Sequence, residues 1–218
     1  MGHSAASVEL LRNAHTALVS DVCDDQGLDG PMLPSAIQRV VGRPGQVVVG
    51  PAYPCRVDPT EEFVEIDVLL EMLESIPVGA VPLVASVESF PAALWGGLMS
   101  AGALSRGAAG AVTTGLIRDV DQIRGIGFDV FGTGRTALDV RRRGAMRAYD
   151  VAVDVGARRI EPGDLVVADG NGVAVIPSAV VDSVAEECGA RLDREQATFN
   201  GLGKGVSPSQ LYADLGEF

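Results

Sequence analysis

The sequence predicts a single-domain α/β fold with a mixed β-sheet, and two observations carry that prediction. Short runs rich in Val, Ile and Leu alternate with segments of helical periodicity, which is typical of strands and helices that alternate along a chain. A β-rich run broken by tight turns follows over residues 151–176. No repeat or linker divides the chain, so we treat residues 1–218 as one domain with peripheral tails at 1–5 and 206–218. No G-x-G-x-x-G follows the first strand, which argues against a Rossmann fold.

The first half of the chain predicts helices and buried strands in turn. The expected elements are one or two helices over residues 7–25 that close at Gly27, a strand pair over 46–57, a helix over 60–76 and a buried strand over 80–87. The helix over 60–76 has the clearest pattern, because Thr60 can cap it and one face is apolar at helical spacing. That face consists of Phe63, Ile66, Leu70 and Leu73.

The second half predicts three helices between short strands. An alanine-rich helix follows the turn at 95–97, runs to Arg106 and is closed by Gly107. A short helix begins at 118–119 and ends near Gly125, and a final helix of about twenty residues opens at Pro177. The expected strands are 111–114, 128–131, 151–155, 165–168 and 173–176, with a hairpin turn over 169–172 between the last two.

The scarcest residues restrict the chemistry most. The chain has two histidines, His3 and His15, and one lysine, Lys204, so that sixteen of its 17 basic residues are arginine. This inventory argues against a histidine triad, a histidine-ligated zinc site and a P-loop lysine. A Schiff base would have to use Lys204. Carboxylate and arginine chemistry remain, with a hard metal that takes oxygen ligands as a further option.

The charge and hydropathy of the chain limit the binding partners and the cellular compartment that we expect. The formal net charge of -12 argues against general nucleic-acid binding. The longest uncharged stretch, residues 89–105, contains proline and two adjacent glycines and is too short to span a bilayer. Since no signal-like segment opens the chain, we expect a cytoplasmic protein. The three cysteines, Cys23, Cys55 and Cys188, are predicted to be reduced and mostly buried.

Two motifs are candidates for a binding site. Arg118-Asp119 follows a predicted strand, where open α/β sheets bind ligands, and would place a guanidinium beside a carboxylate able to hold a cation. In a plainer alternative, Asp119 caps a helix and Arg118 is a surface charge. The segment Gly96-Gly97-Leu98-Met99 would expose backbone N–H groups at a helix start to an anion, or its glycines would simply allow close helix packing.

Glu195 lies on the apolar stripe of the final helix, where a carboxylate requires a partner. The other members of that stripe are Val181, Val184, Cys188, Leu192 and Phe199. Either the helix has left the core at this point and Glu195 is exposed, or the stripe packs on a neighbouring subunit and delivers a carboxylate into its cleft. The basic cluster of residues 141–143 with Arg147 is interpreted as a solvated loop or subunit contact, with a phosphate or RNA site as the alternative.

Four segments, in order, resemble the RraA-like proteins, which include the regulator of ribonuclease activity A and the 4-hydroxy-4-methyl-2-oxoglutarate/4-carboxy-4-hydroxy-2-oxoadipate aldolases. The segments are VVVGPAYPCRV (47–57), WGGLMSAGALSRGAAGAVTTGLIRDVDQI (95–123), GFDVFGTG (127–134) and RRIEPGDLVVADGNGVAVIP (158–177). The Gly-x20-Arg-Asp signature of the family fits Gly97 and Arg118-Asp119.

The resemblance implies a swivelling β/β/α-type sandwich that forms a homotrimer or homohexamer with active sites between subunits. In the aldolase branch, Mg²⁺ or Mn²⁺ would be held through Asp119 and ordered waters, and Arg118 would contact the 2-keto oxygen. Backbone amides around Leu98 and Met99, at the Gly96-Gly97 helix start, would receive the substrate carboxylate. Glu195 of the adjacent subunit would complete the site.

Two positions depart from the aldolase pattern, because Gly97 and Thr114 stand where the family usually has acidic residues. The expected function is a metal-dependent lyase that cleaves 4-hydroxy-4-methyl-2-oxoglutarate-type substrates to pyruvate or decarboxylates oxaloacetate. Decarboxylation is expected to tolerate these changes better, since no hydroxyl proton has to be removed. The alternative is a non-catalytic regulator that binds a ribonuclease or another protein. A methyltransferase acting on a menaquinone precursor has little support, because no glycine-rich cofactor loop is found.

Overall fold

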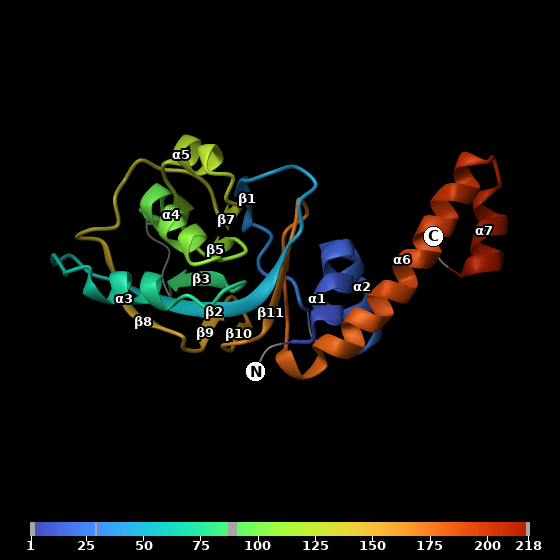
Figure 1. Cartoon of the computed structure of the whole chain (residues 1–218), viewed down its shortest axis with the longest axis horizontal. Helices are drawn as coiled ribbons and strands as arrows, with labels where there is room; N and C mark the ends of the chain where they lie inside the picture. Colours follow the sequence, from blue (N-terminus) through green and yellow to red (C-terminus); the bar gives the residue numbers. More distant parts are fainter. Residues whose placement is uncertain (1–2, 29, 87–90, 217–218) are drawn as a thin grey trace.

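An eight-stranded mixed sheet curls through the centre of the molecule (Figure 1). The computed structural model describes residues 3–28, 30–86 and 91–216. Strands β2, β3, β5 and β7 run parallel, and the others pair antiparallel, so the predicted α/β fold with a mixed sheet is confirmed. Along the sheet the order is β1 (Gln38–Val41), β7 (Val130–Gly132), β5 (Ala111–Thr113), β3 (Val81–Ser86), β2 (Val48–Pro59), β11 (Leu165–Ala168) and β12 (Val173–Ile176), and β8 (Gly144–Tyr149) also pairs with β2.

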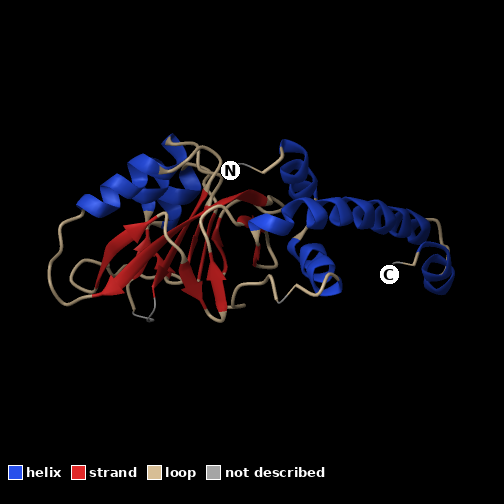
Figure 2. Ribbon diagram, turned by 90° about the horizontal axis from the view of Figure 1, so that it is seen from below, coloured by secondary structure: helices blue, strands red, loops and turns tan. Residues whose placement is uncertain are grey.

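Two groups of helices pack on different parts of the sheet (Figures 1 and 2). One group is α3 (Asp67–Ser75), α4 (Gly97–Ser105) and α5 (Val120–Gly125). The other is α1 (Ala5–Asn13), α2 (Thr16–Asp25) and α6 (Val181–Gly203), which is preceded by a 3₁₀ turn (Ser178–Val180) and followed by α7 (Pro208–Leu215). Two small sheets complete the fold: β4 (Ala93–Trp95) with β6 (Leu116–Ile117), and β9 (Val153–Val155) with β10 (Arg158–Ile160).

The central strands are buried on both faces, as the near-continuous apolar run of β3 predicts. Val81 and Leu83 of β3 pack with Phe131 on the face that the β9–β10 hairpin covers. Val84 packs on the opposite face, in a cluster that includes Met72 of α3 and residues of α4 and α5. All five side chains are fully buried, so both sides of the sheet contribute to the core.

A further apolar cluster joins α1, α2 and α6 to β11 and β12. Two of the three cysteines lie there, and all three are free and buried, which confirms the sequence expectation. Burial raises the pKa of Cys23 to about 11 and that of Cys188 to about 12, so both thiols stay protonated and unreactive at neutral pH.

The helix predicted over residues 60–76 is shorter, and its apolar face differs. It is α3, which begins at Asp67, so Thr60 does not cap it; the Thr60 side chain instead accepts a hydrogen bond from Glu62 N within a turn. Much of the predicted stripe is exposed, with Phe63 53%, Ile66 44% and Leu70 46% accessible. The face that packs on the core shares only Leu73 with that stripe and consists of Leu69, Met72, Leu73 and Ile76.

The expected strand pair over 46–57 is one continuous strand, β2. It changes partner along its length, because Val48–Pro51 pair with β11 whereas Ala52–Val57 pair with β3. The glycine and prolines inside this segment do not interrupt the strand. Strands β1, β4, β6, β8 and β10 were not predicted. The expected tail over 206–218 contains α7, whose Leu211 packs against Gly201 of α6.

The predicted turn over 169–172 is confirmed, and its first residue also anchors a helix. Asp169 N donates to Gly172 O within the β11–β12 hairpin. The buried Asp169 carboxylate accepts hydrogen bonds from Thr16 N, Thr16 Oγ1 and Asn171 N. These bonds outweigh desolvation and lower the pKa of Asp169, so the start of α2 is fixed by an ionised carboxylate. Among the described helices, none is both long and apolar enough to cross a bilayer.

Candidate functional site

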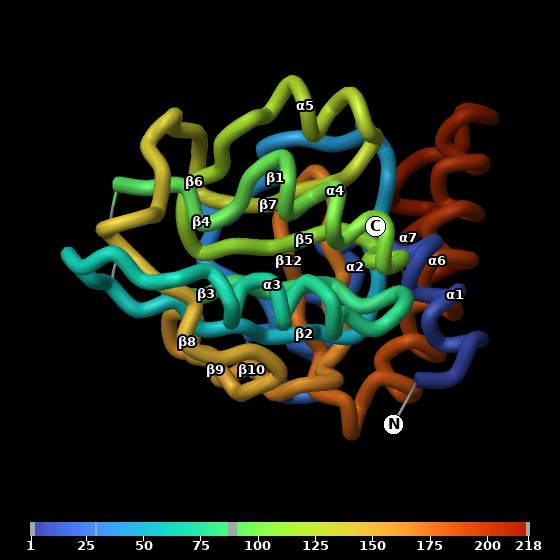
Figure 3. The backbone as a smooth tube through the Cα atoms, turned by 60° about the vertical axis from the view of Figure 1, so that its left-hand side comes forward, coloured from blue at the N-terminus to red at the C-terminus, as the bar shows by residue number. Residues whose placement is uncertain are grey.

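The two sequence motifs meet because two very short strands lie side by side. β4 leads into α4 and β6 leads into α5, and β4 and β6 pair in parallel (Figure 3). Arg118 N donates to Trp95 O at 3.1 Å, directly beyond the last paired residues. Gly96-Gly97 and Arg118-Asp119, which are more than twenty positions apart in the chain, therefore lie next to each other, as the resemblance implied.

The start of α4 presents backbone N–H groups toward this point. Gly96 is the extended N-cap residue, and Gly97 N donates to Asp119 Oδ2 at 3.1 Å. The N–H groups of Leu98 and Met99 follow in the first helical turn, where an α-helix provides no internal acceptor. The helix dipole adds partial positive charge there, so this turn suits an anion.

The helix start is supported from inside the core by Trp95 and Ser100. Trp95 is 1% exposed, and its Nε1 donates to Ser100 Oγ at 2.8 Å. Ser100 Oγ in turn donates to Gly96 O at 3.0 Å. This buried chain of hydrogen bonds fixes the orientation of the Gly96 peptide, and with it the first N–H groups of α4.

Asp119 has a strained backbone and links both motifs. Its φ of 60° lies in the left-handed region, which Asp adopts more readily than most residues other than glycine. Although Asp119 is the N-cap residue of α5, its side chain makes no capping bond to that helix and caps the start of α4 instead. Asp119 Oδ2 also lies 3.3 Å from Arg118 Nε, and neither contact uses Oδ1. The plainer alternative, in which Asp119 caps its own helix, is therefore wrong.

Gly97 allows α5 to approach α4 closely. A Cβ atom at residue 97 would lie 2.7 Å from Gln122 Oε1 and 3.1 Å from Asp119 Cβ. An acidic side chain at this position would require Gln122 to move. The glycine thus serves close packing of α5 on α4. Anion binding by the N–H groups of this segment stays a prediction.

Asp139 is a site residue that the sequence analysis missed. Arg118 Nη1 donates to Asp139 Oδ2 at 2.6 Å, and Arg141 donates to the same carboxylate through its backbone N and its side chain. Desolvation raises the pKa of Asp139, but the bonds from Arg141 and Arg118 outweigh it and hold that pKa well below its usual range. The hydrogen bond that Arg118 donates to Asp139 also raises the pKa of Arg118. The nearby run of arginines was the only sequence signal for this ion-pair network.

A hollow of about 400 Å³ opens beside this network. Arg118, Asp119, Arg135 and Thr136 provide its polar lining. The side chains of Arg118 and Asp119 are each 33% exposed, so they are accessible to a ligand while they remain in ordered contacts. A small anionic molecule would meet a guanidinium here, close to the first turn of α4.

Residues 16–175 match the model of the RraA-like family, described as Aldolase/RraA. The chain belongs to this family.

The proteins that are similar to this chain carry names that indicate different functions. The chain is 27% identical over 212 residues to "Putative 4-hydroxy-4-methyl-2-oxoglutarate aldolase" of Halalkalibacterium halodurans, covering 97% of each protein. It is 26% identical over 208 residues to Protein DlpA of Legionella pneumophila; the match covers 95% of this chain but only 33% of DlpA, so the chain spans about a third of that relative. The solved structure of Streptomyces coelicolor RraAS2, described as an unusual member of the RNase ES inhibitor RraA protein family, is 25% identical, with a TM-score of 0.79 and coverage of 91% of this chain and 98% of that one.

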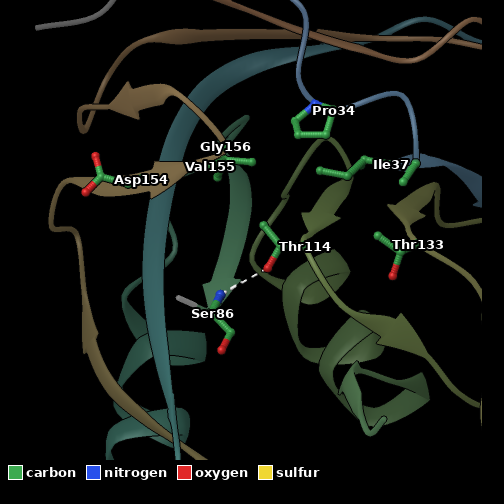
Figure 4. Close-up of a pocket in the computed structure, with 9 residues that line it drawn as sticks. Pro34, Ile37, Ser86, Thr114, Thr133, Asp154, Val155 and Gly156 are labelled. Carbon is green, nitrogen blue, oxygen red and sulfur yellow. Dashed lines mark hydrogen bonds between the residues drawn. The ribbon is translucent and has the colours of Figure 1, made fainter. Parts of the chain in front are cut away.

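Thr114, one of the two departures from the aldolase pattern of the RraA-like family, lines a different hollow from Arg118. Its Oγ1 accepts a hydrogen bond from Ser86 N at 3.0 Å and so ties the ends of β3 and β5 together (Figure 4). That hollow, of about 350 Å³, also contacts Thr133 and Asp154 (Figure 4). Gly97, the other departure, adjoins Asp119 directly.

Glu195 does not join Arg118 and Asp119 within one chain. It lies on α6, across the molecule from α4 and α5 (Figure 1). Its side chain is 24% exposed and its Oε2 lies 3.1 Å from His15 Nε2, so the expectation that it is simply exposed is wrong. The apolar stripe leaves the body one turn later, at the 69% exposed Phe199. Placement of Glu195 in a neighbour's cleft stays a prediction.

The described residues contain no cluster of three or more His, Cys, Asp and Glu side chains arranged to hold a metal ion. Asp119 Oδ1, which neither of the two contacts of Asp119 uses, is the candidate oxygen for a cation beside Arg118. The cluster formed by Arg118, Asp119, Asp139 and Arg141 contains two cations and two anions, so its formal charge is balanced.

Proposed function

We propose that this RraA-like protein is a lyase that cleaves the C3–C4 bond of short 2-keto acids. The observation that carries the proposal is that Arg118 and Asp119 line a hollow and also adjoin the start of α4, where Asp119 accepts a hydrogen bond from Gly97 N. A carboxylate adjacent to a carbonyl matches this pair of donors, because backbone amides and a planar guanidinium both donate hydrogen bonds to oxygen. Substrates would be oxaloacetate and 4-hydroxy-4-methyl-2-oxoglutarate-type diacids.

Binding would orient the substrate between the helix start and the arginine. The C1 carboxylate would accept hydrogen bonds from the N–H groups of Leu98 and Met99, with the C2 oxygen toward Arg118. Arg118 already uses Nη1 for Asp139 and Nε for Asp119, so Nη2 is the donor that would reach the substrate. Because Asp139 and Asp119 hold the guanidinium in place, little reorganisation is needed when the ligand binds.

The chemistry requires stabilisation of an enolate. When the C3–C4 bond breaks, its electron pair moves toward the C2 carbonyl, and Arg118 would stabilise the negative charge that develops on that oxygen. Oxaloacetate would release CO₂ and leave pyruvate enolate, which then takes a proton at C3. Retro-aldol cleavage additionally requires that a base remove the C4 hydroxyl proton, and we assign that role to Glu195 of an adjacent copy.

Asp119 would hold a divalent ion, Mg²⁺ or Mn²⁺. Its donor chemistry fits, since Oδ1 is a hard oxygen and magnesium sites commonly use one or two carboxylates with water and substrate oxygens for the rest. When bound, the ion supplies Lewis-acid polarisation of the C2 carbonyl. Because the ion-pair cluster around Arg118 carries no net charge and Arg135 adds a cation to the lining of the hollow, we expect substrate oxygens to contribute much of the affinity for the ion.

Exposed apolar side chains support an assembly with shared sites. The second half of α6 and α7 form an arm that projects from the body (Figure 2). Phe199 and Tyr212 on this arm are 69% and 62% exposed, and Leu98 at the start of α4 is 85% exposed. Apolar surface on the arm and beside the hollow is what an arm-to-cleft contact between copies requires. We therefore propose a homotrimer or homohexamer in which each arm covers a neighbouring site.

Pyruvate formation tests this proposal. With Mn²⁺ or Mg²⁺, the protein is expected to release pyruvate from oxaloacetate and, separately, from a 4-hydroxy-4-methyl-2-keto diacid, and excess chelator is expected to stop both reactions. Asp119→Ala is expected to abolish the metal-dependent turnover. Asp121→Ala, which removes an exposed carboxylate two residues away, is the matched control and is expected to retain it. Turnover no faster than that of buffered metal alone, for several 2-keto acids, would refute the lyase.

A regulator that binds a ribonuclease or another protein is the second candidate. Two observations favour it: Gly97 leaves Asp119 without a neighbouring carboxylate at that position, and no metal-binding cluster of three side chains is found among the described residues. The description of Streptomyces coelicolor RraAS2 as a member of an RNase inhibitor family also favours a regulator. This candidate would be favoured if the protein forms a stable oligomer, shows no turnover, and keeps the apolar arm of α6 and α7 exposed in that oligomer.

A further inference from the structure

His15, one of only two histidines in the chain, contacts the carboxylate that the proposed function places in a neighbouring site. It is the N-cap residue of α2, and its Nδ1 accepts a hydrogen bond from Leu18 N at 3.1 Å. An acceptor nitrogen carries no proton, so in the neutral ring the proton is on Nε2. That N–H points to Glu195 Oε2 at 3.1 Å and donates to it. The cap therefore selects the tautomer that binds Glu195.

The histidine is a fixed support, because α2 is tied to the body at its first residue. Thr16 N and Thr16 Oγ1 both donate to the buried Asp169, and Leu18 is 1% exposed. Glu195, in contrast, lies on α6 one turn before the 69% exposed Phe199. A glutamate on a projecting helix would otherwise lose considerable side-chain entropy when it adopts one orientation. The bond from His15 connects this carboxylate to the rigid part of the same chain.

We propose that His15 is a positioning residue for Glu195, and that the pair acts as one unit in the active site of an adjacent copy. This inference rests on the proposed function. His15 Nε2–H occupies Oε2 and holds the carboxylate group, which directs Oε1 to the C4 hydroxyl proton of the substrate. His15 itself touches no reacting atom. Both residues belong to one chain, and α5, which follows Arg118, lies across the molecule from α6 (Figure 1). The pair would therefore reach a cleft of a neighbouring copy and not the cleft of its own chain.

Two substitutions separate this role from the capping role. His15→Asn keeps a good N-cap acceptor for Leu18 N, but its shorter side chain does not reach Glu195. We expect His15→Asn to keep the wild-type melting temperature while kcat for the 4-hydroxy-2-keto diacid falls roughly tenfold to a hundredfold with little change in KM. His15→Ala loses the cap as well and is expected to lower both kcat and the melting temperature. His3→Asn, the change at the other histidine, is the matched control and is expected to leave kcat unchanged.

Two further measurements distinguish positioning of Glu195 from a purely structural role of His15. They are the effect of His15→Asn in the Glu195→Ala background and its effect on decarboxylation. If His15 acts through Glu195, adding His15→Asn to Glu195→Ala is expected to lower kcat no further. Oxaloacetate decarboxylation needs no hydroxyl proton acceptor, so His15→Asn is expected to affect it much less than aldol cleavage. Equal loss in both reactions, or fully additive losses with Glu195→Ala, would overturn the positioning role.

Mixed oligomers test whether the pair acts on a neighbour. His15→Asn chains reassembled with Asp119→Ala chains are expected to recover activity in up to about a quarter of the sites, because an intact cleft of one meets an intact pair of the other. His15→Asn mixed with Glu195→Ala offers no intact pair and is expected to recover nothing. No recovery in the first mixture, with subunit exchange verified, would contradict action across the interface.

The tautomer offers a readout that does not depend on turnover. In ¹⁵N-labelled protein at neutral pH, with His3→Asn used for assignment, the His15 ring is expected to show the Nε2–H tautomer and to shift on Glu195→Ala. An Nδ1–H tautomer, or no response to Glu195→Ala, would overturn the inference whether or not the protein is a lyase. A wild-type protein with this His15–Glu195 signature but no turnover would instead count against the proposed function alone.

Discussion

Arg118→Ala is expected to lower kcat for oxaloacetate decarboxylation by about 10²–10³, as for removal of one oxyanion donor. The loss follows from the position of the guanidinium at the hollow, where it would stabilise the enolate oxygen more strongly than the ground-state carbonyl. KM is expected to change less than kcat for the same reason. Initial rates of pyruvate formation at saturating Mn²⁺ measure the effect.

Two further arginine variants delimit this result. Arg118→Lys keeps the positive charge, but an ammonium group cannot contact Asp139, Asp119 and the ligand at once as the planar guanidinium can. Its activity is therefore expected to lie between that of Arg118→Ala and that of the wild type. Arg124→Ala, an exposed arginine on α5 that pairs with Asp121, is expected to behave as the wild type. A rate for Arg118→Ala within a factor of two of the wild type would remove Arg118 from the mechanism.

Trp95→Ala is expected to cost about 3–5 kcal/mol of folding stability, because it empties a large core volume. The side chain is 1% exposed, and its loss also leaves the buried Ser100 hydroxyl without its donor. Circular dichroism at fixed protein concentration is expected to show a melting temperature lower by roughly 6–20 °C.

Trp95→Phe separates the hydrogen bond from the packing. It keeps most of the ring volume and loses the bond to Ser100, so it is expected to cost only about 0.5–1.5 kcal/mol. Because the Trp95–Ser100–Gly96 chain of bonds orients the start of α4, this mild variant is still expected to weaken substrate binding. An Ala variant as stable as the Phe variant would show that Trp95 packing does not matter here.

The sequence predicted the layers of the fold but not the contacts that build the site. The strands buried on both faces, the helix from Gly97 to Ser105 and the turn at 169–172 have strong local signals, and all are present. β4 and β6 are three and two residues long, too short for any periodicity, yet their pairing is what brings Gly97 to Asp119. Local patterns do not contain that information.

The contacts of His15 are also long-range and could not be predicted from local sequence patterns. The scarcity of histidines argues against a histidine triad and a histidine-ligated zinc site, and no local pattern predicts a role for His15. In the structure His15 caps α2 and binds Glu195, which is 180 residues away in the chain. Likewise Asp139 follows a loop with no helical or strand signal and acquires its role only through Arg118. Long-range pairs of this kind depend on tertiary packing and leave no local trace.

Binding of oxalate, a planar mimic of pyruvate enolate, tests most directly whether the hollow beside Arg118 and the start of α4 receives a 2-keto acid. Isothermal titration of the wild-type protein with oxalate in the presence of Mn²⁺ is expected to show about one site per chain, with affinity at least tenfold weaker for Arg118→Ala and unchanged for Arg124→Ala. Absence of binding to the wild type, or equal affinity of the wild type and Arg118→Ala, would contradict the account.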